Sequence, residues 1–200
     1  MRDGTRIAID EMRPDTSGTD TFPTLLIMTR YWRSFKLRTS QPPNKAYIGP
    51  RAHIANFFLS KGYAVVVTDA RGTGASEGIW NHPWATDELQ DHHEVVDWIV
   101  AQQWSNGMIA STGISYEATT ALLLAANGHP AVRAVCAKNF EFDVYTDVAL
   151  PGGVFNQSFI RTWSDSNVIL DADRVPALFG RFAGFIVKGV QPIDADTGGK

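Results

Sequence analysis

Residues 108–126 read MIASTGISYEATTALLLAA, and this stretch decides the fold. The small and apolar residues over 108–112 predict a strand. The alanines and leucines over 116–126 favour a helix, which the following Asn-Gly ends. Ser115 lies between the two, so the sequence predicts that it stands in a sharp turn at the carboxyl end of a strand. Open α/β sheets place their functional sites at this end.

Predicted strands and helices alternate on both sides of this stretch. The strands cover residues 24–28, 63–68 and 131–137, and the helices cover residues 51–61 and 87–103. The valine run in the second of these strands suits a sheet that is covered on both faces. This alternation implies an α/β fold with a mostly parallel, doubly wound sheet. A short edge strand is predicted over 5–9, and a later helix over 173–187 is weakened by its glycines.

The composition is that of an ordinary globular protein of about one domain, with 44% hydrophobic and 20% charged residues. A net charge of −3 without a Lys/Arg stripe argues against a nucleic-acid partner. The longest apolar runs fall far short of a membrane span of about 20 residues, so we expect no membrane partner. No apolar core follows Arg2 as in a signal peptide, which favours a cytoplasmic location. The one cysteine, Cys136, lies in an apolar run, and we expect it to be buried.

The turn at Ser115 has two interpretations. In a nucleophile elbow, the turn lifts the serine above the sheet, and the helix N-terminus faces the developing oxyanion. In a capped turn, the serine has no chemical role. The sequence departs from the usual Gly-x-Ser-x-Gly motif, because Glu117 stands where the motif has its last glycine, and Ala118 follows. Taken alone, the short Gly-x-Ser motif favours the capped turn.

Three glycines after the 63–68 strand raise a different possibility, a dinucleotide site in an oxidoreductase. Gly72, Gly74 and Gly78 are spaced one residue too widely for Gly-x-Gly-x-x-Gly, and no helix pattern starts there. We expect instead that Asp69 and Arg71 fix a loop near the site, with glycines at its tight turns.

The sequence predicts no metal site and no cofactor. His92 and His93 are adjacent on a predicted helix and point about 100° apart, so they cannot easily share an ion. His129 is expected to be a loop residue, and the chain has no His-Glu-x-x-His and no cysteine cluster. Asp194 and Asp196 open a segment like a calcium loop that lacks the later acidic ligand, and we expect an exposed acidic tail.

Several stretches form a recognisable set when they are taken together. They are residues 1–4, Tyr31 after a buried strand, and residues 62–78, 104–107 and 113–116. In this order, and over nearly the whole chain, they resemble the cocaine-esterase and X-Pro dipeptidyl-peptidase family of α/β-hydrolases. The resemblance implies that Ser115 is the nucleophile, that Tyr116 gives its backbone N–H to the oxyanion hole, and that Tyr31 gives its hydroxyl. The family's elbow is Gly-x-Ser-Tyr-x-Gly, so Glu117 fits it and Ala118 departs from it.

The resemblance also implies a partial α/β-hydrolase fold. Residues 1–140 would form the N-terminal part of the core, and residues 141–200 the beginning of a helical cap. We expect a serine hydrolase that acts on ester or amide bonds of small-molecule or peptide substrates and needs no cofactor.

The rest of the catalytic triad is missing from its expected place. In α/β-hydrolases the triad follows the order Ser, acid, His along the chain. His129 is the one histidine after Ser115, and the aspartates from Asp143 onward all follow it. We therefore expect a fragment that lacks the triad Asp and His. The alternative is an inactive remnant, or half of a hydrolase that needs a partner chain, with self-association through the incomplete sheet.

Overall fold

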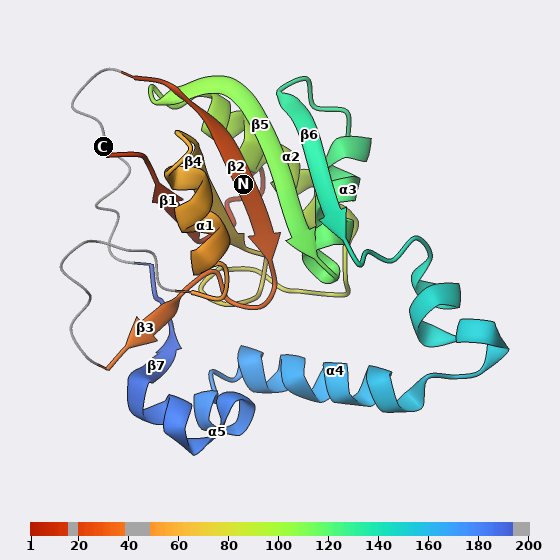
Figure 1. The fold of residues 1–200 in the computed structure, drawn as a ribbon. Coiled ribbons are helices and arrows are strands. Elements are labelled where there is room, and N and C mark those ends of the chain that lie inside the picture. Colours follow the sequence, from red (N-terminus) through yellow and green to blue (C-terminus); the bar gives the residue numbers. More distant parts are fainter. Residues whose placement is uncertain (16–19, 39–48, 194–200) are drawn as a thin grey trace.

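A five-stranded sheet forms the centre of the computed structural model, which describes residues 1–15, 20–38 and 49–193 (Figure 1). The strand order is β1-β4-β2-β5-β6, and only the β1–β4 pair is antiparallel among these pairs. The strands are β1 (Ile9–Met12), β2 (Phe22–Thr29), β4 (Ala64–Asp69), β5 (Ser105–Ile114) and β6 (Val132–Lys138). The sequence-based expectation of a mostly parallel sheet is thus confirmed.

Helices cover both faces of this sheet. Helix α1 (Ala52–Leu59) packs on one face, and α2 (Thr86–Val100) and α3 (Tyr116–Ala126) pack on the other. Alternate residues of β4 enter the two cores: Val65 and Val67 face α1, whereas Val66 faces α2. The valine run is fully buried because both faces are covered.

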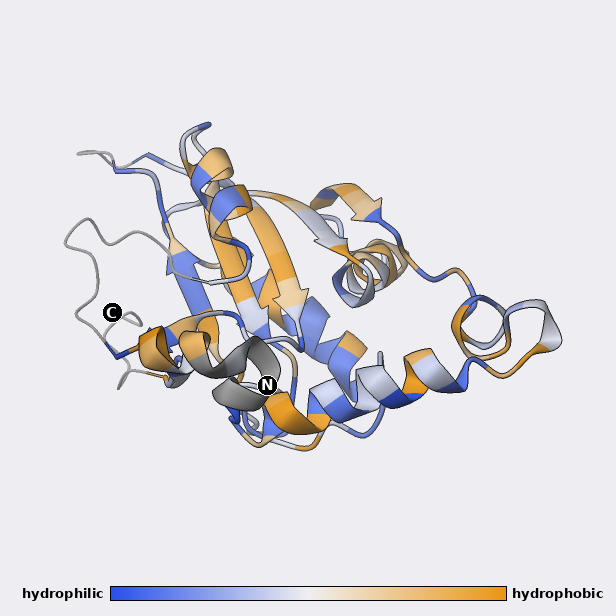
Figure 2. Ribbon diagram, turned by 60° about the horizontal axis from the view of Figure 1, so that its bottom comes forward, coloured by the Kyte–Doolittle hydropathy of each residue, from blue (hydrophilic) through white to orange (hydrophobic). Residues whose placement is uncertain are grey.

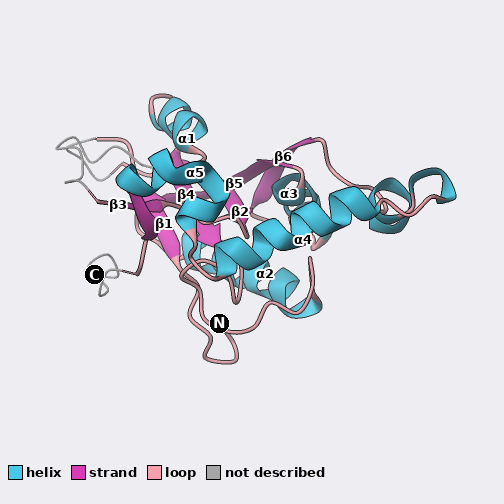
Figure 3. Cartoon of the chain, turned by 90° about the horizontal axis from the view of Figure 1, so that it is seen from below, coloured by secondary structure: helices cyan, strands magenta, loops and turns pink. Residues whose placement is uncertain are grey.

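The chain after β6 is helical and reaches back to the start of the molecule. It contains a π-helical turn (Val144–Ala149), a 3-10 turn (Pro151–Gly153), α4 (Gln157–Asp171), α5 (Val175–Ile186) and β7 (Val187–Val190). Strand β7 pairs antiparallel with β3 (Phe35–Leu37) in a small second sheet. Figure 1 shows α4 running below the arrowheads of the parallel strands, and Figure 3 shows the same helix from below, in front of the sheet.

Three details differ from the sequence-based expectations. The predicted edge strand over 5–9 pairs only from Ile9, because the preceding backbone bonds to a loop instead: Glu77 N–H donates to Arg6 O at 2.9 Å. Cys136 is exposed rather than buried, since β6 is the outermost strand of the described sheet. The predicted helix over 173–187 is broken at Gly180, where φ is 79° and ψ is 168°.

Apolar side chains gather on the exterior of the helical region after β6. Phe142 is 92% exposed and Phe182 is 88% exposed. Figure 2 shows apolar segments along this arm of the molecule as well as in the central strands. No described helix is long and apolar enough to cross a membrane. Asp194 and Asp196, expected to form an acidic tail, lie outside the described residues.

Candidate active site

Ser115 occupies a strained turn between β5 and α3. Its φ is 58° and its ψ is −126°, a conformation that costs a residue with a side chain about 1–3 kcal/mol. A Cβ at Gly113 would collide with Glu117, so the turn requires glycine two residues before the serine. The Ser115 N–H donates to the Lys138 carbonyl of β6 at 3.0 Å, which fixes the turn against the neighbouring strand.

The hydroxyl of Ser115 does not cap the helix that it precedes. It donates instead to Glu141 Oε1 at 3.3 Å, just after β6, and Thr119 Oγ1 donates to the other carboxylate oxygen at 2.6 Å. The capped-turn interpretation requires the side chain to accept from a first-turn N–H, and the structure has no such bond. A strained strand-to-helix turn whose serine hydroxyl does not cap the following helix is the geometry of a nucleophile elbow.

Tyr116 is the first residue of α3, so its backbone N–H has no acceptor within the helix. That N–H lies at the positive end of the helix dipole, where a developing anion is stabilised. The Tyr116 ring is buried, stacks on Trp84 with centroids 4.9 Å apart, and donates its hydroxyl to Glu88. Burial raises the pKa of Glu88 to about 7 and raises the pKa of Tyr116 well above its usual value. The side chain thus anchors the backbone of the elbow.

Tyr31 lies in the loop after β2, beside the elbow. Its ring meets the Tyr116 ring edge to face, with centroids 5.8 Å apart. Trp163 Nε1 of α4 donates to the Tyr31 hydroxyl at 2.8 Å, so the hydroxyl proton is left for another acceptor. Burial raises the pKa of Tyr31, which keeps the phenol neutral and able to donate. The structure therefore brings the three residues expected at the site to one end of the sheet.

A buried ion pair joins the Tyr31 loop to the elbow helix. Arg51, which precedes α1, donates to the Trp32 carbonyl at 2.9 Å and to Thr29 Oγ1 at 2.7 Å. The same guanidinium pairs with Glu117, and both side chains are less than a tenth exposed. Glu117 therefore has a structural reason to follow the serine. Ala118 is fully buried, so its methyl group fits where the family has glycine.

The loop after β4 is closed by charged side chains, as the sequence predicted. Asp69 is fully buried and accepts from the Arg33 N–H at 2.6 Å and the Ala75 N–H at 2.9 Å. Arg71 donates to both oxygens of Asp91 at 2.7 and 2.6 Å. A Cβ at Gly74 would collide with the Asp69 carboxylate. The glycines therefore let the loop fold onto itself rather than form an open phosphate cradle.

Helix α4 contacts the site through Arg30. This side chain is fully buried and donates to Asp171 of α4 at 2.9 Å. Its guanidinium lies 4.4 Å from the centroid of Trp80, which in turn lies 6.2 Å from Trp163. Arg30, Arg51, Glu88, Glu141 and Trp163 were not identified from the sequence, because their partners lie far away along the chain.

No histidine hydrogen-bonds to Ser115 among the described residues. His129 Nε2 donates to Asp97 Oδ1 instead, at 3.0 Å. His129 precedes β6, whereas Ser115 follows β5. Because these strands are parallel, the two residues lie at opposite ends of the strands. His92 and His93 point apart as predicted: His92 is buried beside Glu88, and its burial lowers its pKa to about 3.

Comparisons with known proteins show the family to which the chain belongs. A sequence profile of the X-Pro dipeptidyl-peptidase (S15 family) matches residues 3–178. The chain is 43% identical to a predicted serine esterase of Mycobacterium bovis, covering 98% of this chain and 32% of that protein. It is 32% identical to the cocaine esterase of a Rhodococcus species, covering 82% and 26% respectively. The chain thus spans about a third or less of the length of these relatives.

A solved structure is similar over most of the chain. A hydrolase of the CocE/NonD family from Staphylococcus aureus superposes with a TM-score of 0.72 at 28% identity. The match covers 86% of this chain and 32% of the Staphylococcus protein.

Proposed function

The chain belongs to the X-Pro dipeptidyl-peptidase (S15) family, and we propose that it carries the nucleophile and oxyanion hole of a serine hydrolase. The family and its relatives are hydrolases, and the chain has a partial α/β-hydrolase fold. The observation that carries the proposal is the strained backbone of Ser115 together with its uncapped hydroxyl. We propose ester or amide carbonyls of small molecules or peptides as the substrates.

In the proposed reaction, Ser115 Oγ gives its proton to a general base as it attacks the substrate carbonyl, and a tetrahedral intermediate forms; the base later gives the proton to the leaving group. The Tyr116 N–H and the Tyr31 hydroxyl donate to its oxyanion. One such donor can contribute a factor of about 10²–10³ to the rate. The leaving group departs, and water then hydrolyses the acyl-enzyme.

We propose that the general base and its orienting acid lie outside these 200 residues. His129, the one histidine that follows Ser115 in the chain, lies at the opposite end of the parallel strands from Ser115. Glu141 accepts from the Ser115 hydroxyl, but the base of the serine triad is an imidazole, which takes the serine proton and later gives it to the leaving group. The proposed domain division, with a core over 1–140 and a cap from 141, places the helices after β6 over the site.

A second candidate is a half-enzyme that associates with a partner chain or with itself. The apolar side chains exposed after β6, such as Phe142 and Phe182, favour it. Size-exclusion chromatography separates the candidates. A folded monomer would argue against the partner-dependent half, whereas a dimer or larger assembly would support it.

The nucleophile is tested in two chains. The 200-residue chain alone should release no burst of p-nitrophenol from p-nitrophenyl acetate. A burst that is lost in Ser115→Ala would refute the proposal that the base is missing. A chimera that continues this chain with the remaining two thirds of the Mycobacterium relative should be phosphonylated by a fluorophosphonate, with loss of fluoride, and peptide mass spectrometry should locate the label at Ser115. The control is Ser164→Ala, an exposed serine of α4, which should leave labelling unchanged.

A further inference from the structure

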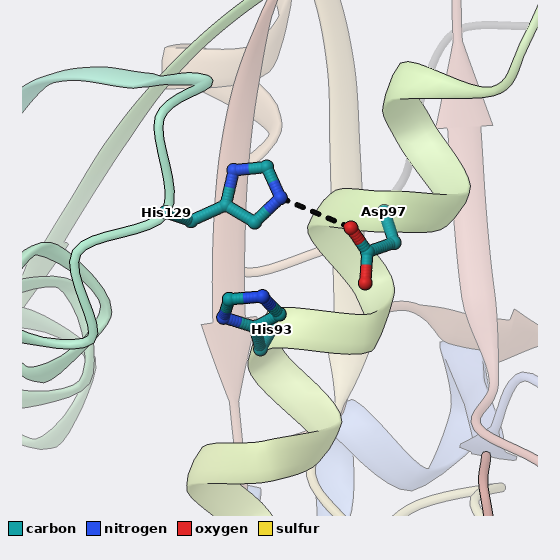
Figure 4. Close-up of side chains that lie close together, drawn as sticks. All are labelled: His93, Asp97 and His129. Carbon is teal, nitrogen blue, oxygen red and sulfur yellow. Dashed lines mark hydrogen bonds and ion pairs between the residues drawn. The ribbon is translucent and has the colours of Figure 1, made fainter.

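A cluster of ionisable side chains lies apart from the proposed active site. His93 and Asp97 lie one turn apart on α2, and His129 lies in the loop between α3 and β6 (Figure 4). Residues four positions apart share one face of a helix, and α2 and α3 pack on the same face of the sheet. The three side chains converge on the side of the sheet where the parallel strands begin, and Ser115 lies where they end.

The geometry is close to that of a metal site. One nitrogen or oxygen atom from each of the three residues lies within 4.8 Å of the others. His129 Nε2 and Asp97 Oδ1 are already 3.0 Å apart, and the two imidazole rings have centroids 4.6 Å apart. Tetrahedral zinc, with ligands at about 2.0–2.1 Å, holds neighbouring ligand atoms about 3.4 Å apart. Small side-chain rotations at His93 are enough to close this difference.

We propose that His93, Asp97 and His129 bind a zinc ion that joins α2 to the loop before β6. Two imidazoles and one carboxylate are a ligand set that suits zinc. The Asp97 side chain is 61% exposed and that of His129 is 8% exposed. The ion is therefore reached from solvent, and water completes its coordination. Neither the fold assignment nor the proposed hydrolase activity enters this inference.

The hydrogen bonds of His129 set the affinity that we expect. The Ala131 N–H donates to its Nδ1 at 3.0 Å, so the proton of the neutral ring is on Nε2, facing Asp97. An ion at Nε2 displaces that proton, Nδ1 becomes protonated, and the bond from Ala131 is lost. This cost and the open coordination positions predict micromolar binding, weaker than that of a closed four-ligand site.

Isothermal titration of zinc into the tag-free, metal-stripped chain tests the site. We expect one ion per chain with a micromolar dissociation constant. His93→Ala and Asp97→Asn should each weaken binding at least tenfold. The matched controls are His53→Ala and His82→Ala, which alter exposed histidines outside the cluster and should leave binding unchanged. At zinc concentrations 100-fold above the dissociation constant, the unfolding midpoint should rise by about 5 °C or more.

Two results would overturn the site. One is the lack of saturable binding below millimolar zinc. The other is binding that persists unchanged in both His93→Ala and Asp97→Asn. Asp97→Asn retains a carbonyl oxygen that accepts from His129, so it keeps the hydrogen bond between α2 and the loop before β6 while it removes the charge. If the Asp97→Asn variant and the parent chain have the same unfolding midpoint without zinc, the variant is folded, and its loss of zinc binding reflects the loss of a ligand.

Discussion

The strain at Ser115 predicts that glycine is more stabilising than alanine at this position. Both substitutions remove the hydroxyl and its bond to Glu141, so the comparison isolates the backbone. The conformation at φ 58° and ψ −126° costs alanine about 1–3 kcal/mol, and glycine avoids that cost. Against this, glycine loses about 0.5–1 kcal/mol more than alanine in chain entropy on folding. With the middle of each range, Ser115→Gly should be more stable than Ser115→Ala by about 1 kcal/mol.

Urea denaturation of the two variants measures this difference, provided that their m values are equal. The matched control is the same pair of substitutions at Ser164, which lies in the middle of α4. There alanine should be the more stable residue, by about 1 kcal/mol. The reasoning fails if alanine equals or exceeds glycine at position 115, because the turn would then carry no strain for glycine to relieve.

Three further predictions follow from the contacts around the elbow. Glu117→Ala should destabilise the chain by about 3–5 kcal/mol because it leaves Arg51 buried without this partner. In urea denaturation, the double variant Glu117→Ala/Arg51→Met should recover much of this loss. Purely additive losses in the two single variants and the double variant would contradict the coupling. Burial raises the pKa of Glu88 from 4.5 to about 7. The contribution of Glu88 to stability is therefore present below pH 4.5 and is lost as the pH rises through 7. Glu88→Gln should flatten this part of the pH–stability curve, and parallel curves for the variant and the parent chain would contradict this role of Glu88. In the chimera, Tyr31→Phe should lower kcat by about 10²–10³-fold with little change in KM. Trp163→Phe should lower kcat less, because the Tyr31 phenol keeps the proton that it donates. An unchanged kcat in Tyr31→Phe would exclude the oxyanion role of Tyr31.

The core of the fold could be predicted because its signals are local. The valine run of β4 and the strand-turn-helix around Ser115 need no distant information, and α3 spans the predicted residues 116–126. The edge strand was placed too early because its backbone partner is the loop at Glu77. The exposure of Cys136 depends on what lies beside β6, which an apolar run alone does not reveal.

The supporting residues of the site could not be predicted for a different reason. Arg51 and Glu117 are separated by 66 positions, and Tyr31 and Trp163 by 132. No spacing rule connects such pairs, so they appear only when the sheet and the helices around it are assembled. Likewise, the adjacent His92 and His93 argued against a metal site, whereas the three-dimensional structure places His93 beside a histidine 36 positions away.

The choice of serine at position 115 is itself evidence about the turn. Glycine would satisfy a left-handed backbone at lower cost, and a capping serine would recover part of the cost by accepting from the helix. Ser115 does neither: it retains a side chain in a strained conformation, and its hydroxyl leaves the cap unfilled. Around it, Gly113 leaves room for the turn, Lys138 holds its N–H, and the Arg51–Glu117 pair fixes its helix. Strain of this kind persists only where neighbours over-determine it, so these contacts hold the Ser115 side chain in a conformation that the turn alone would not favour.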